Sequence, residues 1–571
     1  MQTGEPESRS SGPRHLDRWL LVALMLIALT ARLVPGERTV DDAYITFRYA
    51  RNLLEGRGFV YNPGERVLGT TTPLYTLLLA GLSLASSSRD FPALALRINA
   101  LAGALSVGLL YALGKRFAGH RAPAVAVALL WALTPYSVTF AVGGMETDPT
   151  IALLLAAAYT HIAGKPRALA ILSALALLAR PDTAILLSLL WLDLLIARRR
   201  VPWREGAITL ALLAPWLVFG TLYFGSPLTG SIAAKSAAYR LPPGSAFVRL
   251  LQTYATPFFE REVISPYGVF VLLVLYLALC AMGSRDGFRR NHRTWPISVY
   301  PFAYFAVFSA ANPLIFRWYM SPPLPFYFLL ILTGAWTIIR DITTSVVGRL
   351  VVGKSVHWDT NHPIPNFPIP NFPITNLPIY PFILLAAAAL ALTLNAWTLH
   401  PDHGPDRPAP EMAWFKLELL YARAADIVLA HAAPGDTLCA GDIGVLGYRT
   451  DMRVLDTVGL VTPETASHYP ADSAIYVINY AIPADLVLAL DPDYIVILEV
   501  YGRLGLLPDP RFQARYRLLE KIETDIYGSK GMLIFERRYI SKVYFKGDFL
   551  GIPGRRGYLS GVAATLSTTT R

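Results

Sequence analysis

Long apolar runs separated by short polar interruptions make up most of this chain. They recur from near the N-terminus to about residue 398, and most carry no charge at their centres. They predict about eleven membrane-spanning helices, at approximately 19–34, 91–113, 122–140, 149–163, 167–179, 182–196, 205–224, 266–282, 296–310, 322–339 and 380–398. The pattern therefore predicts a mainly α, polytopic membrane protein.

One further apolar run, Leu74 to Ser86, decides the predicted topology. It has about 13 residues, which is short for a span. If it lies flat at the outer interface, the basic clusters between the later runs share the side of the N-terminus, which the positive-inside rule makes cytoplasmic. These clusters are Lys115/Arg116/Arg121, Lys165/Arg167, Arg198/Arg199/Arg200/Arg204, Arg285/Arg289/Arg290/Arg293 and Arg340/Arg349/Lys354. If the run spanned the membrane, every cluster would move outside, so the flat arrangement is predicted.

Composition and charge agree with this prediction. The chain is 54% hydrophobic and only 16% charged, and its net charge of +11 is explained by the short basic loops, so no nucleic-acid partner is expected. The two cysteines are Cys280, inside an apolar run, and Cys439, in a polar region. They predict neither a disulfide framework nor a cysteine-based metal site.

The polar regions predict the domain organisation. Residues 1–17 form a cytoplasmic segment, and residues 18–399 form a membrane domain in the plasma membrane, interrupted by a Pro-rich cytoplasmic linker at 361–380. A helix over Glu411 to Ala432 and strands in TLCAGDIGVLGY, RVLDTVGL, YIVILEV and MLIFERR predict a small extracytoplasmic α/β domain at 400–540. Residues 541–571 are predicted to be a flexible tail.

The richest polar stretch, DDAYITFRYARNLLEGRGFVYNPGERVLGTTTPL, directly follows the first span. Its apolar spacing predicts an interfacial helix from Ala43 to Glu55. Asp42 is better placed than Asp41 to cap that helix. A cap explains only one of the two carboxylates, and the second, which its neighbour repels, should be retained for another use. We therefore expect at least one of the pair to be catalytic, with Asp41 favoured as the base and Asp42 assisting.

Other predicted outer loops bring further charged and aromatic groups from separate helices. They contain GGMETDP with Glu146, ARPD with Asp182, the loop with Lys235, and RWY with Arg317 and Tyr319. Each group alone is explained as an anchor at the end of a span. Transporters carry ionisable groups at mid-membrane, whereas these gather at the outer rim. Glycosyl transfer from a lipid phosphate fits them, because cations stabilise the leaving phosphate and a carboxylate takes the proton of the acceptor hydroxyl.

The first-loop stretch, together with GGMETD, ARPD, YFGSPL, FRWYMSPPLP, AGDIGVLGY and LDTVGL, resembles the GT-C superfamily of polyprenyl-phosphate-dependent glycosyltransferases. The resemblance covers nearly all of residues 18–540. It is strongest to the branch of the mycobacterial terminal arabinofuranosyltransferases, and more distant to protein O-mannosyltransferases and the aminoarabinose transferase of lipid A. It implies a GT-C fold with two juxtamembrane helices in the first outer loop and a catalytic aspartate at Asp41 or Asp42.

The resemblance also implies an activity and its partners. We expect an inverting glycosyltransferase that moves a sugar from a polyprenyl-phosphate donor to a glycan, lipid or protein acceptor of the cell envelope, on the extracytoplasmic face. No metal site is predicted and no cofactor is required. Whether the enzyme binds a divalent cation is left open. A lipid-linked glycan flippase or exporter and a non-catalytic glycan-binding membrane protein are the alternatives. The candidate substrate-binding residues are Tyr44, Arg48, Glu146, Asp182, Lys235, Arg317 and Tyr319.

Overall fold

The computed structural model describes residues 12–258, 265–355, 377–398, 409–410 and 413–538. The predicted Pro-rich linker, apart from 377–380, and the predicted tail at 541–571 lie outside the described residues.

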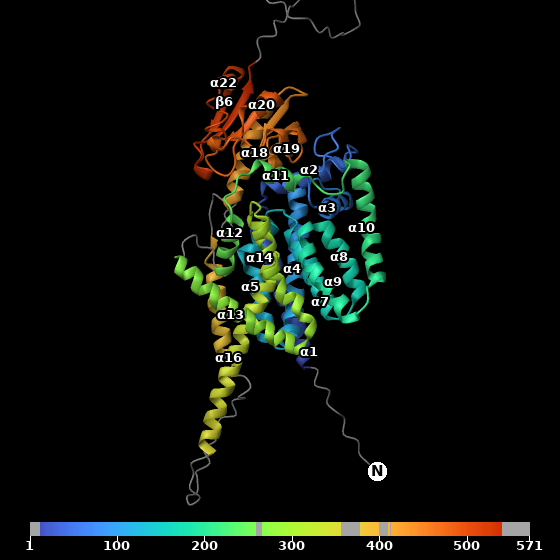
Figure 1. Ribbon diagram of the computed structural model, residues 1–571, viewed down its shortest axis with the longest axis vertical. Coiled ribbons are helices and arrows are strands. Elements are labelled where there is room, and N and C mark those ends of the chain that lie inside the picture. Colours follow the sequence, from blue (N-terminus) through green and yellow to red (C-terminus); the bar gives the residue numbers. More distant parts are fainter. Residues whose placement is uncertain (1–11, 259–264, 356–376, 399–408, 411–412, 539–571) are drawn as a thin grey trace, which may run out of the picture.

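A bundle of helices forms the larger body of the molecule, and α1 begins at the end of the bundle opposite the C-terminal domain (Figure 1). Its helices are α1 (Gly12–Leu33), α4 (Phe91–Ala118), α5 (Arg121–Leu133), α6 (Pro135–Val142), α7 (Thr147–Ile162), α8 (Pro166–Ala179), α9 (Ala184–Arg198), α10 (Trp203–Phe224), α13 (Pro266–Arg290), α14 (Trp295–Ala311), α16 (Leu324–Ser355) and α17 (Ile379–Leu394). Small residues allow the closest crossings. A Cβ on Gly283 of α13 would collide with the Leu330 carbonyl of α16, and one on Gly334 would collide with that of Leu279.

The number of spans is not confirmed. A helix lies at the position of each predicted span, but only α4, α10, α13 and the Leu324–Ser345 part of α16 are long and apolar enough, among the described residues, to cross a membrane. The pair α5 and α6, bent by 42°, makes a fifth candidate. Other helices are short; α8, for example, has 14 residues. About eleven spans therefore stays a prediction.

The short helices α2 (Asp41–Leu54) and α11 (Ser231–Ala238) lie between the bundle and the C-terminal domain (Figure 1). Further short helices are α3 (Pro73–Ser86), α12 (Ser245–Ala255) and α15 (Arg317–Met320). The first loop thus carries two short helices, as expected. Helix α2 begins at Asp41 rather than Ala43, and its N-cap is Val40 with no side-chain cap. The expectation that Asp42 caps this helix is wrong.

The C-terminal domain is built on a five-stranded sheet of order β4-β3-β5-β7-β6. The strands are β3 (Thr437–Ala440), β4 (Arg453–Asp456), β5 (Tyr494–Leu498), β6 (Tyr516–Ile522) and β7 (Met532–Arg537), and a separate pair joins β1 (Trp397–Thr398) to β2 (Ala409–Pro410). Strands β4, β3 and β5 are parallel to one another, whereas β7 pairs antiparallel with both β5 and β6. The helices are α18 (Ala413–His431), α19 (Gly444–Thr450), α20 (Ala484–Leu490), α21 (Glu499–Gly502) and α22 (Pro510–Arg515), and the short 3₁₀ turns include η1 (Pro181–Thr183), η5 (Pro463–His468) and η7 (Ile526–Gly528).

The small α/β domain agrees with the sequence prediction, with two corrections. The segment GVLGYRT forms helix α19 rather than part of a strand. Its two glycines allow it to pack against the first loop at backbone distance, since a Cβ on Gly447 would collide with the hydroxyl of Tyr61. Strand β6 was not predicted, because only its end residues, Tyr516 and Ile522, are buried and a bulge between Leu518 and Glu520 breaks the alternation.

Candidate active site

A cavity of about 230 Å³ lies between the C-terminal domain and the end of the bundle that faces it. Segments far apart in the sequence form its walls: Val40, Asp41, Asp42, Lys235, Tyr239, Leu314, Ile315, Phe316, Trp318, Leu417, Gly441, Asp442, Val458, Leu460, Ile478, Asn479, Tyr501 and Tyr527. Carboxylates, one lysine and several aromatic rings therefore share one small space.

The parallel strands of the C-terminal domain point their carboxyl ends at this cavity. Asp442 follows β3, Val458 follows β4, and Tyr501 lies in α21 directly after β5. In open α/β sheets ligands bind at this edge, where the loops leave the strands. The placement makes the C-terminal domain one wall of the site.

Asp42 and Lys235 form the ion pair of the cavity. Lys235 Nζ lies 3.8 Å from Asp42 Oδ2, and the two side chains are 23% and 29% exposed. Lys235 Nζ also lies 4.9 Å from the centroid of the Phe316 ring. Burial alone would lower the pKa of Lys235, but the negative charge of Asp42 and of its neighbours outweighs burial and raises it. Lys235 is therefore a cation held beside an accessible carboxylate.

The first loop holds α11, and hence Lys235, in place. The Thr229 hydroxyl donates to the Leu68 carbonyl at 2.8 Å, and the Ser231 hydroxyl donates to the Gly69 carbonyl at 2.9 Å. Gly69 donates its N–H to the hydroxyl of Tyr49 at 2.7 Å. A Cβ on Gly69 would lie 2.7 Å from Val461 Cγ1, so the GTTTP segment is packed against both domains. This packing explains why the motif needs a glycine there.

Asp41 makes different contacts from Asp42. Its Oδ2 accepts the N–H of Gly444 at 2.9 Å and its Oδ1 accepts the N–H of Val445 at 2.7 Å, so it binds the first turn of α19 with both oxygens. The side chain is 9% exposed. Burial and the nearby charge of Asp442 raise the pKa of Asp41, and the two backbone donors oppose that rise. Asp41 thus joins the first loop to the C-terminal domain.

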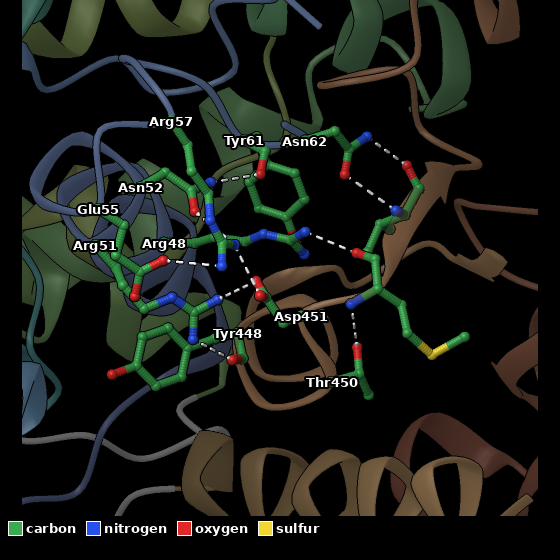
Figure 2. Close-up of polar contacts among 12 residues, drawn as sticks. Arg48, Arg51, Asn52, Glu55, Arg57, Tyr61, Asn62, Tyr448, Thr450 and Asp451 are labelled. Carbon is green, nitrogen blue, oxygen red and sulfur yellow. Dashed lines mark hydrogen bonds and ion pairs between the residues drawn. The ribbon is translucent and has the colours of Figure 1, made fainter. Parts of the chain in front are cut away.

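Residues of α2 and of the loop after it make further contacts with α19 and with the two residues that follow α19 (Figure 2). Arg51 and Arg57 each donate to Asp451 at 2.7 Å, and Arg51 also donates to the Tyr448 carbonyl at 2.8 Å. Arg48, a predicted substrate-binding residue, donates to the Met452 carbonyl at 2.7 Å and is fully buried. The structure therefore places Arg48 in the joint between the domains and not among the cavity walls.

A third carboxylate, Asp442, lines the cavity from the C-terminal domain. Tyr421 donates its hydroxyl to Asp442 Oδ2 at 2.6 Å. Burial raises the pKa of Asp442 to about 6; the Tyr421 hydrogen bond opposes this rise, and the negative charge of Asp42 adds to it. The sequence drew attention to the AGDIGVLGY motif without assigning its aspartate a role.

The LDTVGL motif shapes another wall. Asp456 at the end of β4 accepts the N–H of Val458 at 2.7 Å and that of Val461 at 3.1 Å, and also accepts the N–H of Leu460. These bonds fold the chain into a tight turn, and Val458 and Leu460 from this turn line the cavity. Asp456 is fully buried, and it shapes this wall of the cavity through the turn that it holds.

The other predicted residues form networks beside the cavity. Tyr44 donates its hydroxyl to Glu418 of α18 at 3.0 Å, which adds another contact between the first loop and the C-terminal domain. Asp182 accepts two hydrogen bonds from Arg180, at 3.0 and 2.9 Å, and one from Tyr304 at 3.1 Å. Its carboxylate is therefore already paired within the bundle.

Glu146 and Tyr319 lie near Arg180. Arg180 NH1 is 3.5 Å from Glu146 Oε1, and the Arg180 guanidinium lies 5.2 Å from the centroid of the Tyr319 ring. Burial raises the pKa of Glu146, and the charge of Arg180 opposes this rise. The walls formed by described residues include Phe316 and Trp318 but not Arg317 or Tyr319. Of the nine predicted site residues, the cavity brings together Asp41, Asp42 and Lys235.

Within the described parts of the chain, no group of three or more His, Cys, Asp or Glu side chains is arranged to hold a metal ion. The expectation that no cofactor is needed, with a divalent cation left open, stays a prediction.

Two solved structures share the overall fold. The oligosaccharyltransferase of Archaeoglobus fulgidus, in its apo form, aligns with a TM-score of 0.50 and 13% identity, covering 93% of this chain and 75% of that one. ArnT of Cupriavidus metallidurans, bound to undecaprenyl phosphate, aligns with a TM-score of 0.50 and 13% identity, covering 91% and 97%. At this level of identity the likeness concerns the fold. The chain therefore shares the overall fold of these two structures, which agrees with the resemblance to the GT-C superfamily.

A curated relative adds a match in sequence. The terminal β-(1→2)-arabinofuranosyltransferase of Mycobacterium tuberculosis (strain ATCC 25618 / H37Rv) is 33% identical in an alignment of 222 residues, which covers 35% of this chain and 35% of the relative. The match thus spans about a third of that relative's length. The resemblance to GT-C enzymes, including the arabinofuranosyltransferase branch, is confirmed by these matches.

The C-terminal domain matches a family model of its own. A domain of unknown function, DUF8728, covers residues 413–544. This match begins at the first residue of α18 and includes β7, so it coincides with the separate α/β unit of the structure.

Proposed function

We propose that this protein is an inverting glycosyltransferase of the plasma membrane. It transfers a sugar from a polyprenyl-phosphate donor to a glycan, lipid or protein acceptor of the cell envelope. The reaction takes place on the extracytoplasmic face, and the N-terminus lies in the cytoplasm. The observation that carries the proposal is the cavity in which Asp42 and Lys235 lie 3.8 Å apart, at the outer end of a GT-C fold.

Asp42 is the base of the proposed reaction. Its carboxylate takes the proton of the acceptor hydroxyl while the hydroxyl oxygen bonds to the anomeric carbon of the donor sugar. The bond from that carbon to the phosphate oxygen breaks, and its electron pair stays on the lipid phosphate. Attack from the side opposite the phosphate inverts the configuration. Asp42 suits this role better than Asp41, because both oxygens of Asp41 already accept backbone hydrogen bonds.

Lys235 stabilises the charge of the departing phosphate. A lysine ammonium donates charge-assisted hydrogen bonds to phosphate oxygens without having to supply a proton. In the protein alone Lys235 faces Asp42. A bound donor phosphate would take the place of Asp42 as its partner, which would free the carboxylate for the acceptor.

Aromatic walls support a carbohydrate substrate. Tyr239, Trp318, Tyr501 and Tyr527 line the cavity together with three aspartates, Asp41, Asp42 and Asp442. Flat apolar rings pack against the C–H faces of sugars, and carboxylates accept hydrogen bonds from their hydroxyls. The arabinofuranosyltransferase relative makes arabinofuranose the first sugar to test.

A panel of donors tests the proposal. Membranes that contain the protein are incubated with radiolabelled undecaprenyl-phosphate sugars, including arabinofuranose, and label in water-soluble and envelope fractions is counted. Label from at least one donor should move only when the active protein is present. If no label moves from any donor, the proposal is wrong, and transport of intact lipid-linked glycan becomes the leading alternative.

A further inference from the structure

Asp442 has no role in the reaction proposed above, although it lines the same cavity as Asp42 and Lys235. The hydroxyl of Tyr421 donates a hydrogen bond of 2.6 Å to Oδ2 of Asp442. Its Oδ1 accepts no hydrogen bond from the residues that the structure describes. A half-buried carboxylate with one oxygen held and the other facing a cavity is positioned to receive a hydrogen bond from a ligand.

The two halves of the cavity differ in what they offer a substrate. Asp42 and Lys235 belong to the bundle half, where the lipid tail of a donor would remain in the membrane. Asp442, Tyr501 and Tyr527 belong to the C-terminal half. Asp442 follows β3 at the carboxyl edge of the parallel strands, where α/β domains bind their ligands. An acceptor that comes from the aqueous compartment reaches this half first.

We infer that Asp442 is an acceptor-binding residue: its Oδ1 accepts a hydrogen bond from one hydroxyl of the acceptor glycan and thereby presents another hydroxyl to Asp42. This inference rests on the proposed function. It gives the C-terminal domain a direct part in substrate binding, in addition to its attachment through Asp41 and Arg48.

The charge state of Asp442 gives the inference a pH signature. Burial, reinforced by the charge of Asp42 and opposed by the Tyr421 hydrogen bond and the charge of Lys235, raises the pKa of Asp442 to about 6. Above that pH the residue is a carboxylate, which accepts stronger hydrogen bonds than the neutral acid. The KM for the acceptor should therefore fall as pH rises through about 6.

The test uses the full chain in lipid nanodiscs, with undecaprenyl-phosphate arabinofuranose as donor and octyl arabinofuranoside as acceptor. For Asp442→Asn, we expect the acceptor KM to rise about tenfold, equivalent to about 1.4 kcal/mol, and its pH dependence near 6 to vanish. The donor KM should stay within about twofold. The matched control is Asp426→Asn, which changes an aspartate of α18 whose side chain is 61% exposed, and it should behave like the wild type.

Tyr421→Phe is a second variant, which keeps the carboxylate and removes its hydroxyl partner. Because that hydrogen bond lowers the pKa of Asp442, the midpoint of the acceptor pH profile should move upward. If Asp442→Asn transfers with the wild-type acceptor KM and pH profile, the inference is overturned while the proposed function stands.

If the wild type transfers no sugar, the proposed function fails, and binding of octyl arabinofuranoside, followed by tryptophan fluorescence, decides on Asp442. About tenfold weaker binding to Asp442→Asn than to the wild type supports the inference. Equal binding to the two proteins overturns it, as does absence of binding to the wild type.

Discussion

Replacing Asp41 by asparagine should loosen the joint between the domains rather than remove the chemical step. The carboxylate accepts two backbone N–H groups, from Gly444 at 2.9 Å and Val445 at 2.7 Å, in a buried position. Asparagine keeps one acceptor oxygen, and its NH₂ group faces the second donor, so one buried N–H loses its partner. Such a loss costs about 1–3 kcal/mol, and the loss of charge weakens the hydrogen bond that remains.

We therefore expect local opening of α19 to become easier by about 3 kcal/mol, which is roughly a hundredfold loss of hydrogen-exchange protection at Gly444 and Val445. Exchange read by mass spectrometry on the full chain in nanodiscs measures this. The matched control is Asp90→Asn, because Asp90 is an exposed N-cap of α4 whose side chain accepts from Ala93, and asparagine caps helices nearly as well as aspartate. Unchanged protection in Asp41→Asn, combined with loss of sugar transfer, would make Asp41 the base and contradict its role as an anchor.

Two further substitutions separate the phosphate site from the domain joint. Lys235→Met should lower kcat by about 10²–10³-fold and raise the donor KM, because a preorganised cation beside the leaving phosphate is lost. Initial rates over a series of donor concentrations measure both constants, and Lys521→Met, at a partly exposed lysine of β6, is the control. Wild-type kinetics in Lys235→Met would contradict the phosphate-binding role. Glu418→Gln should flatten the pH dependence of stability. Burial raises the pKa of Glu418 to about 7 from 4.5, so the neutral acid contributes stability that is fully present below about pH 4.5 and is lost as pH rises through 7. Between pH 5 and 8 the wild type should lose up to about 3 kcal/mol more unfolding free energy than the variant. Its thermal midpoint should therefore fall more steeply with pH, and an equal fall of the midpoint in both proteins would contradict this.

The sequence predicted the features that depend on local pattern. Hydrophobic periodicity located a helix at each predicted span, the two helices of the first loop and most strands of the C-terminal domain. It did not predict how many helices cross a membrane, since several are shorter than a span requires. It also expected a strand at GVLGYRT, where contacts with α2 and Tyr61 favour a helix.

For the candidate site too, the sequence predicted what depends on local pattern and missed what depends on contacts between distant segments. The sequence selected Asp41, Asp42 and Lys235, which the fold brings to one cavity. It favoured Asp41 as the base, because it could not show that both oxygens of Asp41 accept N–H groups of Gly444 and Val445, about 400 residues away in the chain.

Residues of the C-terminal domain were harder to find. Asp442 and Tyr501 reach the cavity only through the docking of that domain onto the first loop, and no local pattern reports such docking. The available signal was a short strand followed by a Gly-Asp turn, which is typical of the ligand-binding edge of an α/β sheet.

Single-turnover transfer by Asp42→Asn tests the proposed chemistry most directly. The full chain in nanodiscs is loaded with radiolabelled undecaprenyl-phosphate arabinofuranose, mixed with octyl arabinofuranoside, and sampled over time beside the wild type. Because a positioned base contributes about 10²–10⁴-fold to rate, the rate constant for transfer should fall by at least about a hundredfold, while donor binding and thermal stability stay as in the wild type. Transfer by Asp42→Asn at the wild-type rate would contradict the assignment of Asp42 as the base.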